Sequence, residues 1–184
     1  MLSLLMCGGK GERLKAGEKP MLKVCGKRLI DHSLSELKDF EILAVTSPFT
    51  PNTEKYLESI GVKFYRAKGR GFIEDYIEAC KILRICEPIL IVSADLVYFR
   101  KGILKEVVNF YKISGKPALK VVSANRPIGI NVVDASMIDY EQDESIFIIS
   151  EEDVVNINTI EDAKRAEEIW KLREKDLQKD LKKS

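Results

Sequence analysis

The first stretch that could do chemistry lies directly after the apolar run Leu2–Met6. Residues 7–20 carry four glycines and four basic residues, in the order Cys-Gly-Gly-Lys-Gly-Glu-Arg-Leu-Lys-Ala-Gly-Glu-Lys-Pro. A buried strand that opens into such a loop can present backbone N–H groups to an anion, while lysine and arginine side chains neutralise its charge. The pattern therefore predicts a binding site for a nucleoside triphosphate.

Two common glycine motifs do not account for this loop. A dinucleotide-binding fingerprint needs a small residue where Leu14 stands, and a Walker A loop needs Gly-Lys-Ser/Thr after its spacer, which this stretch does not have. The alternative to a phosphate site is a glycine-rich turn whose charges are only solvated. The local pattern by itself leaves this alternative open.

A single acidic residue follows the most apolar predicted strand, 89–92. The strand ends in Ser93, Ala94 and Asp95. A carboxylate at the carboxyl tip of a central strand can hold a divalent cation over phosphates, because Mg²⁺ takes one or two protein carboxylates together with phosphate oxygens. We therefore expect Asp95 to bind Mg²⁺, and a helix or turn cap is its alternative role.

Two further loops are predicted at the same edge of the sheet. The predicted strand 42–46 ends in Thr-Ser-Pro at 46–48, and open α/β sheets bind ligands at the carboxyl ends of their strands. Residues 66–71, which read Arg-Ala-Lys-Gly-Arg-Gly, form a second basic glycine loop after the predicted strand 62–65. This loop could approach the base or the triphosphate, and a solvated turn explains it equally well.

The elements that must position these loops alternate along the chain. Apolar runs rich in Ile, Val and Leu alternate with segments of helical period, which is typical of βαβ units and a mostly parallel sheet covered on both faces. We therefore expect an α/β fold. The predicted strands are 2–6, 42–46, 62–65, 89–92, 119–122, 129–133, 146–149 and 154–157, with 21–24 extended, and the predicted helices are 29–38, 51–60, 73–83, 103–111 and 160 to beyond 172.

Polar residues precede the last predicted helix. Thr159 and Asp162 have the spacing of a capping box, which explains both without any function. Asn156 and Asn158 remain, and one of them could reach a metal or a phosphate oxygen. For each alone, a local turn hydrogen bond is the favoured alternative.

Composition narrows the class of protein. At 184 residues, with 45% hydrophobic and 32% charged residues, the chain fits one soluble globular domain spanning 1–184, with 176–184 a frayed tail. The 30 Lys and Arg against 29 Asp and Glu leave no global basic field, so we expect no nucleic-acid partner. No apolar run approaches the roughly 20 residues that a transmembrane helix needs.

The four cysteines indicate a compartment. Cys7, Cys25, Cys80 and Cys86 form no CxxC pair, so neither a zinc site nor a disulfide framework is expected. Free thiols are typical of the reducing cytoplasm, which is therefore the expected location.

Several motifs together resemble a known family. Residues 8–13, Gly-Gly-Lys-Gly-Glu-Arg, followed by Glu-Lys-Pro at 18–20, are similar to the GGxGxR…KP signature of the MobA-like nucleotidyltransferases. The segment 156–162 resembles the N-x-N-T-x-E-D segment of the same family. Four weaker pieces resemble its archaeal branch that guanylylates adenosylcobinamide phosphate, namely Thr-Ser-Pro at 46–48, Gly-Phe-Ile-Glu-Asp at 71–75, Ser-Ala-Asp-Leu at 93–96 and Gly-Ile-Asn-Val-Val at 129–133.

The resemblance covers nearly the whole chain and implies both a fold and a site. The fold would be the single-domain, Rossmann-like three-layer α/β/α fold of the nucleotide-diphospho-sugar transferases. Arg13, Lys19 and Asp95 would be the catalytic residues, which neutralise the triphosphate and hold Mg²⁺. The implied nucleotide-binding residues are Gly8, Gly9, Lys10, Gly11, Arg13, Lys19, Thr46, Ser47, Pro48, Gly69, Gly71 and Asp95; Gly129 and Asn131 would contact the acceptor, and Asn158 would join Asp95 at the metal.

Gly129 has an alternative explanation, because a glycine inside a strand is also typical of a β-bulge.

The implied reaction joins two phosphates. A phosphate oxygen of a phosphorylated corrinoid acceptor would attack the α-phosphorus of GTP and release pyrophosphate. This phosphate is already ionised near neutral pH, so no strong general base is needed. The only histidine, His32, has no candidate nucleophile near it in the sequence, which excludes a hydrolase triad.

Three points stay open at this stage. The preference for guanine rests on the resemblance alone, since no residue spacing encodes it. A molybdenum-cofactor or sugar-phosphate nucleotidyltransferase would use the same opening loop, and a non-catalytic GTP-binding protein is the alternative of another class. The sequence does not fix the oligomeric state, and a homodimer is compatible with it.

Overall fold

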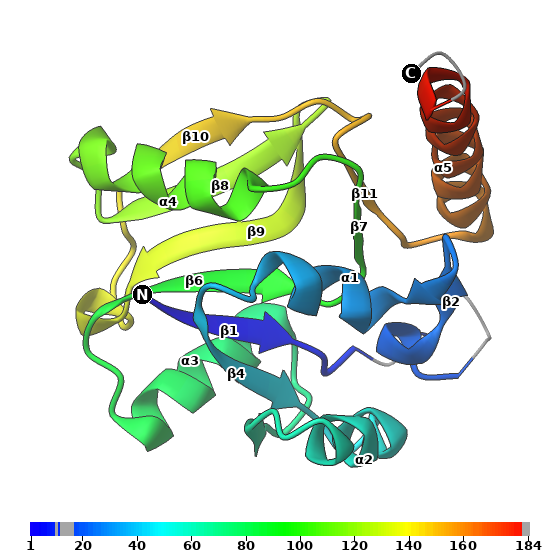
Figure 1. The fold of residues 1–184 in the computed structure, drawn as a ribbon. Helices are drawn as coiled ribbons and strands as arrows, with labels where there is room; N and C mark the ends of the chain where they lie inside the picture. The colour runs from blue at the N-terminus through cyan, green and yellow to red at the C-terminus, as the bar shows by residue number, and fades with distance from the viewer. Residues whose placement is uncertain (10, 12–16, 182–184) are drawn as a thin grey trace.

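A seven-stranded sheet forms the centre of the molecule (Figure 1). The computed structural model describes residues 1–9, 11 and 17–181. The strand order is β10-β8-β9-β6-β1-β4-β5, and β9 is antiparallel to both of its neighbours while the other pairs are parallel. The strands are β1 (Leu2–Met6), β4 (Glu41–Thr46), β5 (Phe64–Arg66), β6 (Pro88–Ser93), β8 (Ala118–Ser123), β9 (Arg126–Asp134) and β10 (Glu144–Ile148). The expected α/β fold with a mostly parallel sheet is confirmed.

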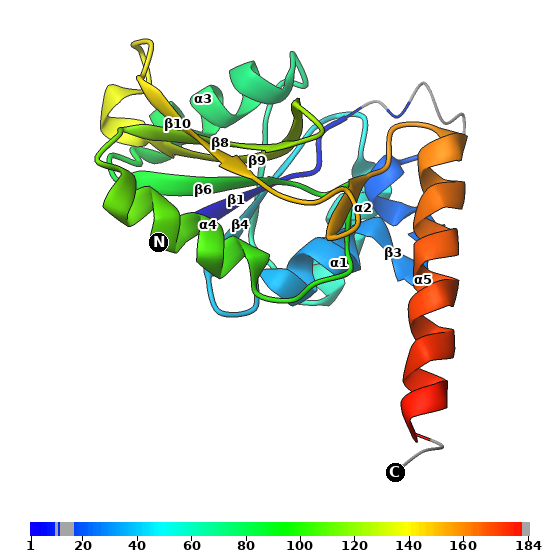
Figure 2. The same ribbon diagram turned by 90° about the horizontal axis from the view of Figure 1, so that it is seen from above.

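Helices cover both faces of this sheet, which gives three layers (Figure 2). One face packs against side chains of three helices, α1, α2 and α4, and the other face packs against α3. The helices are α1 (Leu29–Glu36), α2 (Pro51–Ser59), α3 (Phe72–Leu83) and α4 (Ile103–Ser114), with short 3₁₀ turns η1 (Lys19–Met21) and η2 (Ala135–Met137).

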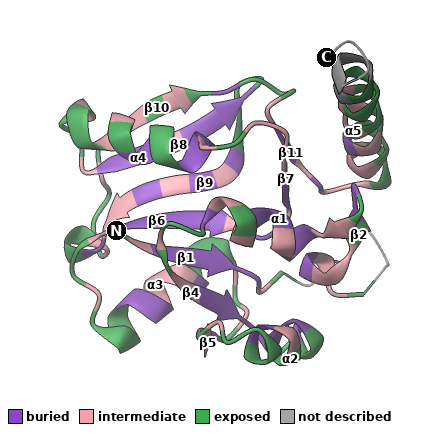
Figure 3. Cartoon of the chain, viewed as in Figure 1, coloured by how far each residue is buried: buried purple, intermediate pink, exposed green. Residues whose placement is uncertain are grey.

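Strand β1 lies at the middle of the core. Leu4 and Leu5 are fully buried and belong to the two clusters on opposite faces of the sheet. This follows from the alternation of side chains along a strand, since a strand covered on both faces buries successive side chains on opposite sides. Figure 3 shows the same contrast between the buried central strands and the exposed outer helices.

Two small sheets were not expected from the sequence. Strand β7 (Leu96–Tyr98) pairs antiparallel with β11 (Val154–Asn156), and β2 (Lys23–Val24) pairs with β3 (Lys27–Arg28). The late strand predicted at 154–157 therefore pairs outside the main sheet. The pairing brings residue 158 beside residue 95, because the Ile157 N–H donates to the Asp95 carbonyl over 2.9 Å.

The last helix, α5 (Ile160–Leu181), stands beside the sheet and projects beyond it (Figure 1, Figure 2). Its Glu167 Oε1 accepts from the Cys25 N–H at 2.5 Å, and the Trp170 ring lies against Gly26. The helix is assigned to Leu181, and its last turns are rich in Lys, Glu, Leu and Gln, which are good helix formers. The fraying of 176–184 stays a prediction. Among the described residues, no helix is long and apolar enough to cross a membrane.

Candidate functional site

A pocket of about 420 Å³ opens at the carboxyl ends of β1 and β6. Met6 and Ser93 are register partners in these parallel strands, so the loops that follow them leave the sheet at the same edge. The volume lies in the range typical of small-ligand sites. The lining residues are Met6, Cys7, Gly8, Gly9, Gly11, Lys19, Pro20, Gly69, Arg70, Gly71, Phe72, Asp75, Ser93, Ala94, Asp95 and Asn158.

Three polar side chains from distant parts of the chain meet in this pocket. The Lys19 ammonium donates to Asp95 Oδ2 at 2.5 Å and to Asn158 Oδ1 at 2.8 Å. The side chains of Lys19 and Asp95 are 14% and 15% exposed, so water screens their attraction little. The ammonium thus lies between the two residues expected to hold a metal.

The same residues fit a divalent cation. Asp95 Oδ1 is buried and has no hydrogen-bond partner among the residues that the structure describes, which is costly unless another group satisfies it. Within residues 1–9, 11 and 17–181, no group of three or more His, Cys, Asp or Glu is placed to hold a metal by itself. One carboxylate and one amide oxygen, completed by phosphate oxygens, is a set that suits Mg²⁺.

The glycine loop has a backbone that other residues would not allow. Gly11 has φ +63°, and a Cβ there would stand 2.8 Å from the Gly17 carbonyl oxygen. At the start of the loop, Ser47 Oγ donates to the Gly8 carbonyl over 2.8 Å. The loop is therefore close-packed against its neighbours at Gly8 and Gly11.

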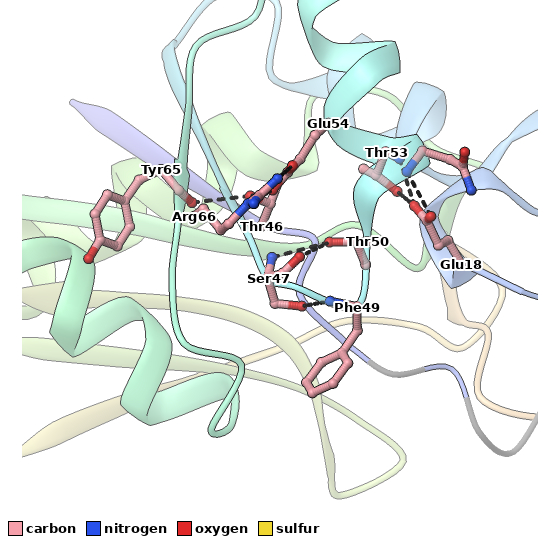
Figure 4. A network of polar contacts seen from close by, with 10 residues as sticks. Glu18, Thr46, Ser47, Phe49, Thr50, Thr53, Glu54, Tyr65 and Arg66 are labelled. Atoms are coloured by element: carbon pink, nitrogen blue, oxygen red, sulfur yellow. Dashed lines mark hydrogen bonds and ion pairs between the residues drawn. The ribbon is translucent and has the colours of Figure 1, made fainter.

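Glu18 anchors the end of this loop to a helix (Figure 4). Its carboxylate accepts from the backbone N–H groups of Asn52 and Thr53 at 2.7 and 2.6 Å, and from the Thr53 hydroxyl at 2.7 Å. These N–H groups belong to the first turn of α2, which has no side-chain cap from its own N-cap residue. Because Glu18 directly precedes Lys19, the anchor holds the turn that carries the ammonium.

Residues 46–48 lie behind the pocket rather than on its wall. Thr46 Oγ1 donates to Glu54 Oε1 at 2.7 Å, and Glu54 is also paired with Arg66 (Figure 4). The Arg66 hydrogen bond lowers the pKa of the Glu54 carboxyl, against the effect of its burial. Thr46 and Ser47 are fully buried and Pro48 is exposed, and none of the three lines the pocket.

Asp75 is the residue that sequence reasoning missed. It lies in the first turn of α3, is 4% exposed, and accepts from the Arg70 N–H at 3.0 Å. Burial raises its pKa, while backbone N–H groups of residues 69–71 partly oppose this. In the sequence, the Gly-Phe-Ile-Glu-Asp piece at 71–75 stands out only as a family resemblance, and its last residue is the signal that points to this carboxylate.

The described groups offer no nucleophile for covalent catalysis. Cys7 lines the pocket, but burial first and the Asp95 charge second raise the pKa of its thiol far above the ordinary range. His32 Nε2 is 2.9 Å from the Val24 carbonyl and lies away from the pocket wall. The chemistry available here is therefore positioning and charge neutralisation.

The structure brings most of the expected site residues together. Gly8, Gly9, Gly11, Lys19, Gly69, Gly71, Asp95 and Asn158 all line the pocket. Lys10 and Arg13 lie outside the described residues. Gly129 and Asn131 lie on β9 beside the pocket and do not line it.

The asparagines before α5 do not make the local turn bonds that were favoured for them. Asn158 accepts from Lys19, and Asn156 Nδ2 donates to the Ile128 carbonyl over 3.1 Å. The capping box is confirmed, since the Asp162 N–H donates to Thr159 Oγ1 and the Asp162 carboxylate accepts from the Thr159 N–H.

Comparison with known proteins gives consistent results. Residues 3–166 match the model of the MobA-like NTP transferase domain. A relative from Methanocaldococcus jannaschii, named adenosylcobinamide-phosphate guanylyltransferase, is 37% identical over 198 residues, which cover 93% of this chain and 98% of that protein.

Two solved structures share the fold. A protein from Bacillus anthracis, provisionally assigned as a glucose-1-phosphate thymidylyltransferase, has a TM-score of 0.74 at 14% identity, over 92% of this chain and 95% of that one. Molybdopterin-guanine dinucleotide biosynthesis protein A from Archaeoglobus fulgidus has a TM-score of 0.69 at 19% identity, over 92% and 98%. At these identities the likeness concerns the fold alone.

Proposed function

The chain belongs to the MobA-like NTP transferase family and is a nucleotidyltransferase, and from this premise we propose that it transfers GMP from GTP to adenosylcobinamide phosphate. The products are adenosylcobinamide-GDP and pyrophosphate. The relative of that name matches over almost the full length of both chains. The observation that carries the proposal is that the described glycines of the loop, Lys19, Asp95 and Asp75 line one pocket.

The triphosphate is assigned to the glycine-loop end of the pocket. Backbone N–H groups of Gly8, Gly9 and Gly11 hold phosphate oxygens, and Lys19 turns from Asp95 to offset the charge that collects on the leaving pyrophosphate. Arg13, and Lys10 beside it, keep the supporting roles that the family signature implies.

Asp95 and Asn158 are assigned to the metal. Asp95 Oδ1, which has no partner among the described residues, and Asn158 Oδ1, which accepts from Lys19, are the protein oxygens that would hold Mg²⁺. When bound, Mg²⁺ draws negative charge from the α-phosphate and from the leaving group. The pocket itself must hold the two substrates side by side although both are anionic and repel each other.

The bond changes need no protein nucleophile. An oxygen of the acceptor phosphate forms a bond to the α-phosphorus of GTP. The bond between that phosphorus and the oxygen that bridges the α- and β-phosphates breaks. Its electron pair leaves with pyrophosphate. This agrees with the raised pKa of the Cys7 thiol, which keeps that side chain protonated and unreactive.

Asp75 is assigned to the base. A carboxylate can accept from both the N1–H and the N2 amino group of guanine, whereas adenine offers no such pair of donors. Asp75 is buried in the pocket, which raises its pKa, and it has no cationic partner among the described residues. Two hydrogen-bond donors from a base would stabilise its carboxylate in place of the water that burial excludes. Hydrogen bonds to a charged group are worth about 1.5–3 kcal/mol each.

Asp75→Asn tests the assignment of the base. The amide keeps an oxygen for the Arg70 N–H but cannot accept from two donors, so GTP affinity should fall at least about tenfold. The unliganded variant should unfold at the same temperature or higher, since a buried charge has been removed. Inosine triphosphate, which lacks the N2 amino group, should lose less affinity than GTP. Equal GTP affinity in both proteins would contradict this assignment.

A panel of substrates tests the reaction. GTP, CTP and UTP are each offered with adenosylcobinamide phosphate, molybdopterin and glucose 1-phosphate, and pyrophosphate release is measured. The proposal expects turnover with GTP and the corrinoid, and a fall of orders of magnitude in Asp95→Ala. Turnover only with another acceptor would identify a different transferase. GTP binding that survives Asp95→Ala, without pyrophosphate release from any acceptor, would identify a non-catalytic binding protein.

We also propose a cytoplasmic location. All four cysteines are free thiols, and three of them are buried. Free cysteines of this kind suit a reducing compartment.

A further inference from the structure

One face of the sheet carries apolar side chains that the other described residues leave exposed. On β8, β9 and β10, α4 packs against one face, where Phe147 contacts Phe110. On the opposite face, Ile146 and Ile148 are 56% and 74% exposed. We call this the open face, and from the strand registers and the alternation of side chains it comprises Glu144, Ile146 and Ile148 of β10, Lys120 and the largely buried Val122 of β8, and Pro127, Gly129 and Asn131 of β9.

The open face is continuous with the nucleotide pocket. Ser93 lines the pocket at the end of β6, and β9 is the neighbouring strand. Gly129 has φ +85°, and a Cβ on it would stand 2.8 Å from Ser93 Cβ. Only glycine therefore fits at position 129, where β9 packs against Ser93 at the pocket rim.

The dimensions suit a ligand much wider than a nucleoside. From β6 across β9 and β8 to β10 is three inter-strand steps, or about 14 Å at about 4.8 Å per step. A molecule lying on β10 with its phosphate at Ser93 must span that distance. A sugar phosphate would reach only part of the way.

The open face combines apolar side chains with one ion pair and one amide. Ile146 and Ile148 are two residues apart on β10, so both point to the same side, beside Val122. Lys120 and Glu144 form an ion pair with each other, so their charges are already balanced. Asn131 adds an amide that can donate and accept. Such a surface favours a broad, largely apolar ring system with amide groups at its edge over a hydroxyl-rich sugar.

We propose that the open face binds the macrocycle of the phosphorylated corrinoid acceptor, with Ile146 and Ile148 against the ring and the acceptor phosphate at Ser93. The inference rests on the proposed function and names the surface that selects its acceptor. A second copy of this chain is the competing occupant, because β10 is an edge strand with exposed apolar residues. Continuity with the pocket favours the substrate, because Gly129 of the open face packs directly against Ser93 at the pocket rim.

Charge insertion on the face is the test. Ile146→Asp and Ile148→Asp are compared with Ile113→Asp, which changes an 82% exposed isoleucine on α4 at the other face. For each protein we measure GTP affinity by calorimetry, adenosylcobinamide phosphate affinity by its visible absorbance, steady-state kinetics, melting temperature and mass in solution. Both β10 variants should raise the Kd and KM for the corrinoid about tenfold or more, with GTP affinity unchanged. The Ile113 variant should match the wild type.

Each other result overturns the inference in its own way. If the wild type guanylylates the corrinoid and both β10 variants keep its KM, the acceptor binds elsewhere while the proposed function stands. If the wild type uses only a sugar or pterin phosphate, the corrinoid occupant is wrong together with the proposed function. If the wild type is a dimer that Ile148→Asp dissociates without change in corrinoid affinity, the open face is a protein interface.

Discussion

Lys19 occupies the position between Asp95 and Asn158 where the metal is expected, and this gives a sharp prediction. A divalent cation that binds without nucleotide must displace the ammonium from Asn158 Oδ1, at 2.8 Å, and must share the Asp95 carboxylate with it, since the ammonium is 2.5 Å from Oδ2. With nucleotide present, the phosphates offer the ammonium a new partner. We therefore expect the unliganded protein to bind the metal weakly, and Lys19→Met to bind it more tightly.

The magnitude follows from the hydrogen bond that the metal must break. A hydrogen bond between charged groups contributes about 1.5–3 kcal/mol, and Lys19 and Asp95 are largely buried. Each 1.4 kcal/mol is about a tenfold change, so Lys19→Met should raise metal affinity about 10- to 150-fold in the absence of nucleotide. The same change should weaken GTP binding, because a positive charge is lost from the pocket.

Mn²⁺ is the probe, because its free form has a strong electron paramagnetic resonance signal. The wild type and Lys19→Met are titrated without nucleotide, alongside Lys23→Met, which removes a nearby exposed lysine. The double variant Lys19→Met/Asp95→Asn should lose the gain, since the metal needs the carboxylate. Mn²⁺ affinity in Lys19→Met within twofold of the wild type, or below it, would refute the reasoning.

Three other predictions concern the residues that support the site. Glu18→Ala removes the acceptor that caps α2, so it should destabilise the protein by about 1–2 kcal/mol and raise the KM for GTP. The control Glu58→Ala, on the same helix, should have neither effect. If stability and KM are unchanged in both variants, the cap does not position the loop. Glu54 has a lowered pKa, so its stabilising effect should be complete above its usual value of 4.5 and lost as the pH falls through the folded value. Urea unfolding between pH 3 and 7 should therefore show the stability gap between wild type and Glu54→Gln closing in acid, and a gap independent of pH would contradict this. Ala124→Gly should stabilise the β8–β9 hairpin by about 0.5–1 kcal/mol, because Ala124 has φ +46° and a type I′ turn favours residues that accept positive φ. A melting temperature below that of the wild type would contradict this.

Much of the architecture could be read from local pattern. The strand before the glycine loop, the alternation of strands and helices, and the acidic residue at the end of β6 are all visible in short windows of sequence, because side-chain period and turn chemistry act over a few residues. The family signature at residues 8–20 added the expected kind of chemistry. These observations were sufficient for the sheet, for most pocket residues and for Asp95.

The sequence therefore determined which loops carry the chemistry, and the tertiary structure decided which side chains meet there. Lys19 reaches partners 76 and 139 residues away, and Asp75 enters the pocket from α3 beside the glycine loop. Packing of separate elements sets such contacts, and no local period encodes it. The β7–β11 pairing that brings Asn158 to Asp95, the cap of α2 by Glu18, and the uncovered isoleucines of β10 are consequences of the same kind.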